Sequence, residues 1–106
     1  MATVSRVDIL RSMVEQDPRN SFARYGLAIE HMNGGDLDQA IIEFQTLLAN
    51  DPDYVAGYFH AGRTLEKANR LEEAREIYEQ GIQAATRKGD SHTKSEIQAA
   101  LDMLGL

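Results

Sequence analysis

Three histidines are the side chains of this sequence best suited to catalysis or metal binding. His31, His60 and His92 lie in different parts of the chain, and no two of them are four residues apart. Two histidines four residues apart would place their imidazoles on one helical face, as a zinc site on a helix requires. The sequence contains no cysteine, which excludes disulfides, thiolate zinc sites, iron–sulfur clusters and cysteine nucleophiles. We therefore expect no metal site.

The carboxylates also give no sign of a catalytic pair. Glu72, Glu73, Glu76 and Glu79 form a run at helical spacing, which is typical of a solvated helix face. A catalytic pair needs an enclosing pocket that separates its two pKa values. The sequence has no glycine-rich phosphate loop after a strand and no G-x-S-x-G motif. We expect a protein that is not an enzyme and holds no cofactor.

Composition restricts the partners further. The chain has 106 residues, with 11 lysines and arginines against 17 aspartates and glutamates, and a formal net charge of −6. This balance argues against nucleic acid, which attracts dense positive charge. No apolar run approaches the ~18–20 residues of a membrane span, and the first residues lack the apolar core of a signal peptide. We expect one domain over residues 1–106, located in the cytoplasm.

Two prolines reveal an internal repeat. Pro18 and Pro52 each follow an aspartate, and they are 34 residues apart. Because proline fits the start of a helix and breaks its interior, the pair predicts two equivalent helix boundaries. Residue size and polarity also recur at the same interval: Tyr25 matches Phe59, Ala28 matches Gly62, Leu37 matches Leu71, Ala40 matches Ala74, and Phe44 matches Tyr78.

Capping residues and apolar spacing predict only helices. Asp17 is expected to cap the helix that follows Pro18, Gly34-Gly35 ends that helix, and Gly89 suits a left-handed C-cap. A capping box at Thr93–Glu96 is expected to open the last helix. The predicted helices span residues 4–16, about 18–33, 37–50, 53–68, 71–88 and 91–104.

The repeat resembles the tetratricopeptide repeat, whose motif is W-x2-L-G-x2-Y…A-x3-F…P. The first copy reads Arg24-x2-Leu27-Ala28-x2-His31, Ala40-x3-Phe44 and Pro52; the second reads Tyr58-x2-Ala61-Gly62-x2-Leu65 and Ala74-x3-Tyr78. Arg24 and His31 depart from the two aromatic positions. The resemblance implies an all-α, right-handed helical-repeat solenoid of antiparallel helix pairs with about six helices. Repeats would span 21–54 and 55–88, with a half-repeat helix at 4–16 and a capping helix at 91–104.

The N-terminal helix leaves two alternatives open. It corresponds to the second helix of a repeat whose first helix is missing, so it either caps the stack or offers an uncovered apolar edge. That edge would consist of Val7, Leu10 and Val14, and it would form a homodimer seam or dock on another protein.

The resemblance also implies a concave groove, lined by the first helix of each repeat, that holds a peptide or a partner helix. Spacing independently places residues 22, 25, 29 and 32, and residues 56, 59, 63 and 66, on single helical faces. The full set of groove positions is Phe22, Tyr25, Gly26, Ile29, Met32, Asn33, Ala56, Phe59, His60, Arg63, Glu66 and Lys67. Gly26 is expected to be either a shallow floor for a ligand side chain or simply a tolerated weak residue. The alternative is that Phe22 and Tyr25 pack against the first helix or the loop.

Charge gives the predicted groove a direction. Residues 1–53 carry 4 basic and 9 acidic side chains, whereas residues 54–106 carry 7 and 8. Arg63, Lys67 and Lys94 are expected to make one end of the groove basic. Some members of the family clamp a terminal carboxylate with lysine and asparagine, but Tyr25, Ile29 and His60 stand at those positions here. The expected ligand is a short apolar protein segment with an acidic group; the alternative function is self-assembly into a homodimer.

Overall fold

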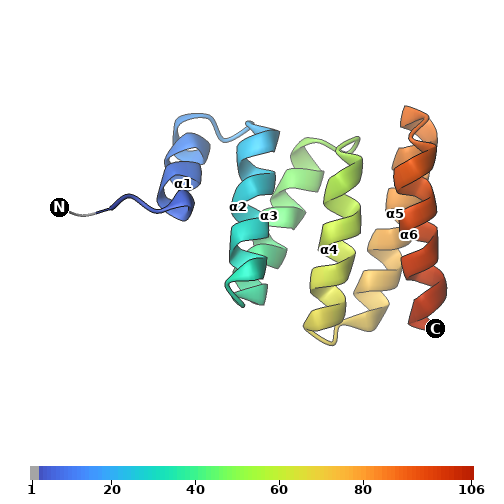
Figure 1. Ribbon diagram of the computed structural model, residues 1–106. Helices are drawn as coiled ribbons and strands as arrows, with labels where there is room; N and C mark the ends of the chain where they lie inside the picture. Colours follow the sequence, from blue (N-terminus) through green and yellow to red (C-terminus); the bar gives the residue numbers. More distant parts are fainter. Residues whose placement is uncertain (1–2) are drawn as a thin grey trace.

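The structure is a row of antiparallel helices. A computed structural model describes residues 3–106, which form six α-helices and no strand. Figure 1 shows α2, α4 and α6 side by side in one layer, with α3 and α5 behind them. The helices are α1 (Arg6–Gln16), α2 (Ser21–Asn33), α3 (Leu37–Asn50), α4 (Val55–Lys67), α5 (Leu71–Lys88) and α6 (Ser91–Leu104). The all-α helical-repeat fold is therefore confirmed. No helix within the described residues is both long and apolar enough to cross a membrane.

Several helices begin at residues other than those expected. The first starts at Arg6, where Ser5 and Asp8 form a capping box. Asp17 does not cap α2; its side chain accepts a hydrogen bond from the Arg19 amide (3.2 Å) inside the turn. Asn20 caps α2 through the Ala23 amide (3.0 Å). In the same way Asp90, not Thr93, caps α6, and α4 starts at Val55. For α2 and α6 a neighbouring polar residue takes the cap, whereas Tyr54, which precedes α4, makes no side-chain cap hydrogen bond.

The turns inside the two helix pairs repeat as the sequence does. Gly35 has a positive φ of +85°, and Asn69, which stands 34 residues later, has a φ of +60°. Left-handed backbone is accessible to glycine and is tolerated by asparagine. The next amide bonds back into the preceding helix in both turns, from Asp36 to the His31 carbonyl and from Arg70 to the Leu65 carbonyl (both 2.9 Å).

Small residues allow the helices of each pair to approach closely. The ring of Tyr78 is fully buried against Gly62, where an added Cβ would lie 2.5 Å from the Tyr78 Cζ. The matching positions of the first repeat hold Ala28 and Phe44, both also buried. Gly81 similarly lies against Tyr58, whose Cβ would be 2.6 Å from an added Cβ. Gly62 and Gly81 therefore allow the close approach of α4 and α5.

Arg24, which departs from the family's aromatic position, makes the same connection as its counterpart. Tyr58 stands 34 residues later, and its hydroxyl donates to the Pro52 carbonyl (2.7 Å). Arg24 Nη2 donates to the equivalent Pro18 carbonyl (3.1 Å). Arg24 Nη1 also donates to the buried carboxylate of Glu43 (3.2 Å), while its Nε is buried without a partner. The first repeat therefore contains a buried ion pair where the second contains Tyr58 and Ile77.

Replacing Gly62 with alanine should destabilise the fold by about 1–3 kcal/mol, because the added methyl overlaps the Tyr78 ring. Urea unfolding followed by circular dichroism measures the change. Gly34→Ala is the matched control: its backbone is right-handed helical, and the added Cβ meets only backbone carbonyl oxygens, the nearer at 3.3 Å. Equal stability of the two variants would contradict the close-packing interpretation.

Breaking the buried ion pair with Glu43→Ala should cost about 3–5 kcal/mol, because it leaves the Arg24 charge buried without a counterion. The double variant Arg24→Tyr with Glu43→Ile copies the second repeat and should recover most of that loss in the same unfolding assay. The single variants Arg24→Tyr and Glu43→Ile are the controls. If the stability lost by the double variant equals the sum of their two losses, the pair does not act as a unit.

Candidate interaction groove

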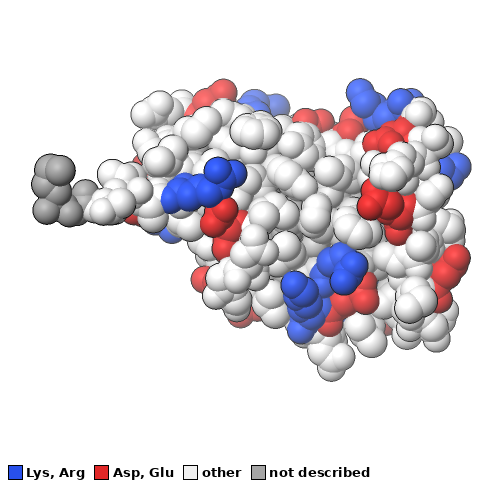
Figure 2. All heavy atoms as spheres, in the orientation of Figure 1, with Lys and Arg blue, Asp and Glu red and all other residues white. Residues whose placement is uncertain are grey.

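Three helices line one face of the molecule. α4 contacts both α2 and α6, and Figure 1 shows the three in one layer. Figure 2, in the same orientation, shows a broad uncharged area over the middle of α2 and the upper part of α4. Acidic and basic side chains gather over the C-terminal half of α4 and around the edges. We call this surface the concave face.

An aromatic cluster occupies the middle of the concave face. The ring centroids of Tyr25 and Tyr54 are 5.2 Å apart, those of Tyr25 and His60 are 5.7 Å apart, and those of Phe59 and His60 are 5.3 Å apart. Each of these side chains is partly exposed. The two His60 contacts are edge-on, a geometry that aromatic rings favour. The cluster joins α2, the turn before α4, and α4 into one continuous surface.

Arg63 extends the cluster along α4. Its guanidinium lies over the Phe59 ring, 5.9 Å from the centroid, which is within cation–π range. Its Nε is 3.9 Å from a carboxylate oxygen of Glu66, to which the Tyr78 hydroxyl also donates a hydrogen bond. The cation is therefore positioned by an aromatic face on one side and by a carboxylate on the other.

A hollow of about 410 Å³ continues the surface between α4 and α6. Its lining is Phe59, Arg63, Glu66, Glu96, Ala99, Ala100 and Met103. Met103 is 86% exposed, so a large flexible apolar side chain stands at the edge of the hollow. Contact from such a residue adapts readily to different ligand shapes.

The structure brings most of the predicted groove residues together, with different degrees of burial. Tyr25, Ile29, Met32 and Phe59 are partly buried and pack against the core. Phe22 is 69% exposed, so it does not pack against α1 or the loop. Asn33, Ala56, Arg63 and Lys67 are exposed, while His60, Glu66 and Lys94 are partly buried.

Gly26 does not form a groove floor. A Cβ added there would lie 3.2 Å from Leu10 Cδ2 and 3.4 Å from Leu10 Cδ1. Gly26 therefore lies where α1 approaches α2. Because it has no side chain, Leu10 of α1 can pack directly against α2 at this position. The expectation of a ligand pocket at Gly26 is wrong.

The edge expected from Val7, Leu10 and Val14 is covered within the chain. Leu10 is only 6% exposed, and Val7 and Val14 are partly buried. These three residues form the apolar face of α1 that packs on α2, so they do not form an uncovered edge. Among the apolar side chains of α1 itself, Ile9 is 51% exposed and Met13 is also exposed.

The basic residues do not form a single end of the groove. Lys94 is in the first turn of α6, whereas Lys67 is the last residue of α4. Because α4 and α6 run in the same direction (Figure 1), these two lysines lie toward opposite ends of the concave face. Glu66 and Glu96 line the hollow between them. The predicted gradient from apolar to basic is therefore replaced by a mixed pattern.

Sequence reasoning missed Tyr54, Glu96, Ala99 and Met103. Tyr54 precedes α4 at a position where a polar capping residue is usual. The presence of an aromatic residue there was the signal in the sequence that could have identified it as part of the site. The other three lie on α6, which the sequence assigned only a capping role. Among residues 3–106 there is no group of three or more histidines, aspartates or glutamates that could hold a metal ion.

The comparison with known families agrees with this arrangement. A family model described as Tetratricopeptide repeat matches residues 25–89. The chain belongs to the tetratricopeptide-repeat family. A TPR repeat-containing protein of Pseudomonas aeruginosa is 30% identical over 98 residues, which cover 92% of this chain and 93% of that protein. The tetratricopeptide fold serves in general as a protein–protein interaction module, and the family is typically non-catalytic.

Two solved structures show the same architecture. A tetratricopeptide repeat domain protein of Salinibacter ruber has a TM-score of 0.78 at 38% identity, over 83% of this chain and 89% of that one. A protein of Bordetella parapertussis has a TM-score of 0.81 at 27% identity, over 99% of this chain and 90% of that one.

Within this tetratricopeptide groove, burial controls the protonation of His60. Its place between the rings of Tyr25 and Phe59 desolvates the imidazole and lowers its pKa. Glu96 acts in the opposite direction, and Arg63 adds to the lowering. The neutral imidazole is therefore favoured in the folded chain, and it presents an aromatic edge rather than a charge.

NMR titration of His60 should give a pKa below the usual value of about 6.5. Glu96→Gln should lower this pKa further, and Arg63→Gln should raise it, because each removes one of the opposing charges. Since the unfolded chain binds the proton more readily, the stability contributed by neutral His60 is lost as pH falls below about 6.5. A pKa at or above 6.5 in the wild-type chain would contradict the burial of this ring.

Proposed function

We propose that the concave face binds a segment of a partner protein, anchored on the cluster of Tyr25, Tyr54, Phe59 and His60. The observation that carries the proposal is the continuity of this cluster across α2 and α4 while its rings remain partly exposed. Exposed aromatic side chains beside an arginine are the residues that most often dominate binding energy at interfaces. Such a role is non-catalytic.

The chemistry of the face suggests the kind of segment. An apolar side chain of the ligand would lie on the Tyr25 and His60 rings, and a second would enter the hollow beside Met103. Arg63 and Lys67 offer positive charge next to the apolar surface, so an acidic group would suit the ligand there. Glu66, which lies between these two cations on α4, and Glu96 on α6 offset part of this positive charge.

A second candidate function is homodimerisation through α1. It is favoured by the exposure of Ile9 and Met13 on this helix, and not by the covered stripe at Leu10. Analytical ultracentrifugation separates the two candidates: a dimer that becomes monomeric on Ile9→Asp would support self-assembly, and a monomer at high concentration would remove it.

Tyr25→Ala should reduce partner binding at least about tenfold, because it removes the ring that links Tyr54 to His60. Arg63→Glu should also weaken it, by reversing the charge over Phe59. The measurement is affinity capture from a lysate of the source organism, with captured proteins quantified by mass spectrometry.

Arg75→Glu is the matched control, because within residues 3–106 Arg75 pairs only with Glu72 and Glu79, both on α5. Circular dichroism checks that each variant keeps its helices. If Tyr25→Ala and Arg63→Glu capture the same proteins in the same amounts as the control, the concave face is not the binding surface.

A further inference from the structure

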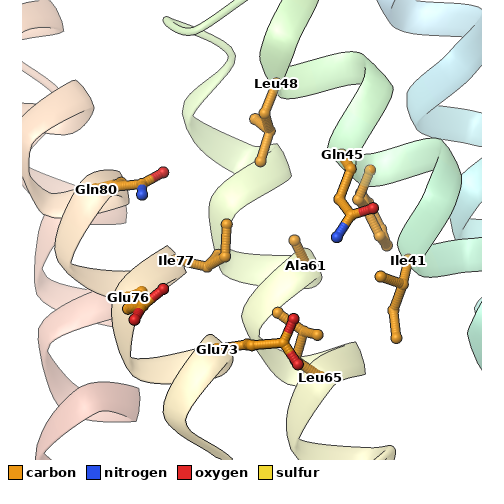
Figure 3. A pocket seen from close by; sticks show the side chains of 10 residues that line it. Ile41, Gln45, Leu48, Ala61, Leu65, Glu73, Glu76, Ile77 and Gln80 are labelled. Atoms are coloured by element: carbon orange, nitrogen blue, oxygen red, sulfur yellow. The ribbon is translucent and has the colours of Figure 1, made fainter. Parts of the chain in front are cut away.

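A second hollow lies on the opposite side of the molecule. α3 and α5 both pack on α4, but among the described residues no Cα atom of α3 lies within 8 Å of one of α5. The space between them is about 160 Å³. Figure 3 shows Gln45 and Ile77 pointing into it from its two sides, with Ala61 of α4 at its floor. The concave face has no part in this hollow, which we call the convex hollow.

The floor of the convex hollow is apolar. Ile41, Phe44 and Leu48 come from α3, and Ala61 and Leu65 come from α4. All five are buried, although they line an open space. The short side chain of Ala61 keeps the floor low. A cavity of about 150 Å³ with apolar walls binds a benzene molecule in another protein, so the convex hollow has room for one phenylalanine or leucine side chain.

The rim of the convex hollow is acidic. Glu73 and Glu76 line it from α5, with Gln45 and Gln80 as the other polar residues. Arg70 donates to both carboxylate oxygens of Glu73, at 2.5 and 2.7 Å, and so neutralises one of the two acids. Glu76 has no ion pair within residues 3–106, and no lysine or arginine is among the lining residues.

From these two features we infer that the convex hollow is a docking site for a basic protein segment, distinct from the concave groove. The segment inserts one phenylalanine or leucine side chain onto Ala61 and Leu65, and a neighbouring lysine or arginine pairs with Glu76, the rim acid that has no ion pair within residues 3–106. The apolar floor supplies the affinity, and the acidic rim selects the charge of the partner. The inference stands independently of the function proposed for the concave face.

NMR spectra of the ¹⁵N-labelled chain test this inference with a defined probe. The probe is the capped peptide Ala-Lys-Ala-Phe-Ala-Lys-Ala, and its two controls replace phenylalanine with alanine or both lysines with glutamate. The probe should shift the amides of Ala61, Glu73, Ile77 and Gln80 saturably. The alanine control should bind at least about tenfold more weakly, and the glutamate control should also bind more weakly.

Two variants of the chain identify the site. Ala61→Leu fills the convex hollow and should abolish binding without lowering the unfolding midpoint. Glu73→Gln with Glu76→Gln leaves the floor intact and should weaken binding about twofold to tenfold. Glu72→Gln, which removes an acid outside the lining, and Tyr25→Ala should both leave probe binding unchanged.

Four results would overturn the inference. One is equal binding of the lysine and glutamate peptides. The second is a set of shifts centred on Tyr25, Phe59 and His60, and the third is unchanged binding after the double glutamine substitution. The fourth is a change in the same amides when the chain alone is diluted, which would make a second copy of this chain the occupant. If Ala61→Leu fails to fold, probe binding to the double variant Glu73→Gln with Glu76→Gln still tests the inference.

Discussion

The close approach of the two helices in each repeat is the constraint on which the rest of the structure depends. Tyr78 can pack this closely on α4 because position 62 is glycine, and Ala28 and Phe44 hold the matching positions of the first repeat. This contact ties α5 to α4 and α3 to α2. Since α4 also contacts α2 and α6, these three helices form one surface, whereas α3 and α5 remain apart on the other side. The two hollows described above lie on these two sides of the stack.

The order and type of the elements could be read from the sequence because several local signals agreed. The apolar spacing and the two prolines repeat with the same period, and Gly34-Gly35, Asn69 and Gly89 mark helix ends. The precise helix starts could not be read in the same way. Asp17 and Asn20 are both good caps, as are Asp90 and Thr93, and only the path of the chain through the turn decides which one bonds.

The sequence predicted which site residues share one face of a helix, but not which other helices and turns contact that face. Helical spacing correctly grouped Tyr25 with Ile29, and Phe59 with Arg63. It could not show that Leu10 covers Gly26, because a stripe on one helix does not reveal which helix lies over it. Tyr54 and Met103 were missed for a related reason: they join the concave face from a turn and from the last helix, outside the matched repeat positions.

The ion pair between Arg24 and Glu43 has a consequence for the folding of near-equivalent repeats. If α2 paired with α5, Arg24 would meet Ile77 in place of Glu43, and if α3 paired with α4, Glu43 would meet Tyr58. Either exchange would bury a charge without its counterion, which costs several kcal/mol. The ion pair therefore gives the folding chain a register, because it makes each helix distinguishable from its counterpart in the other repeat.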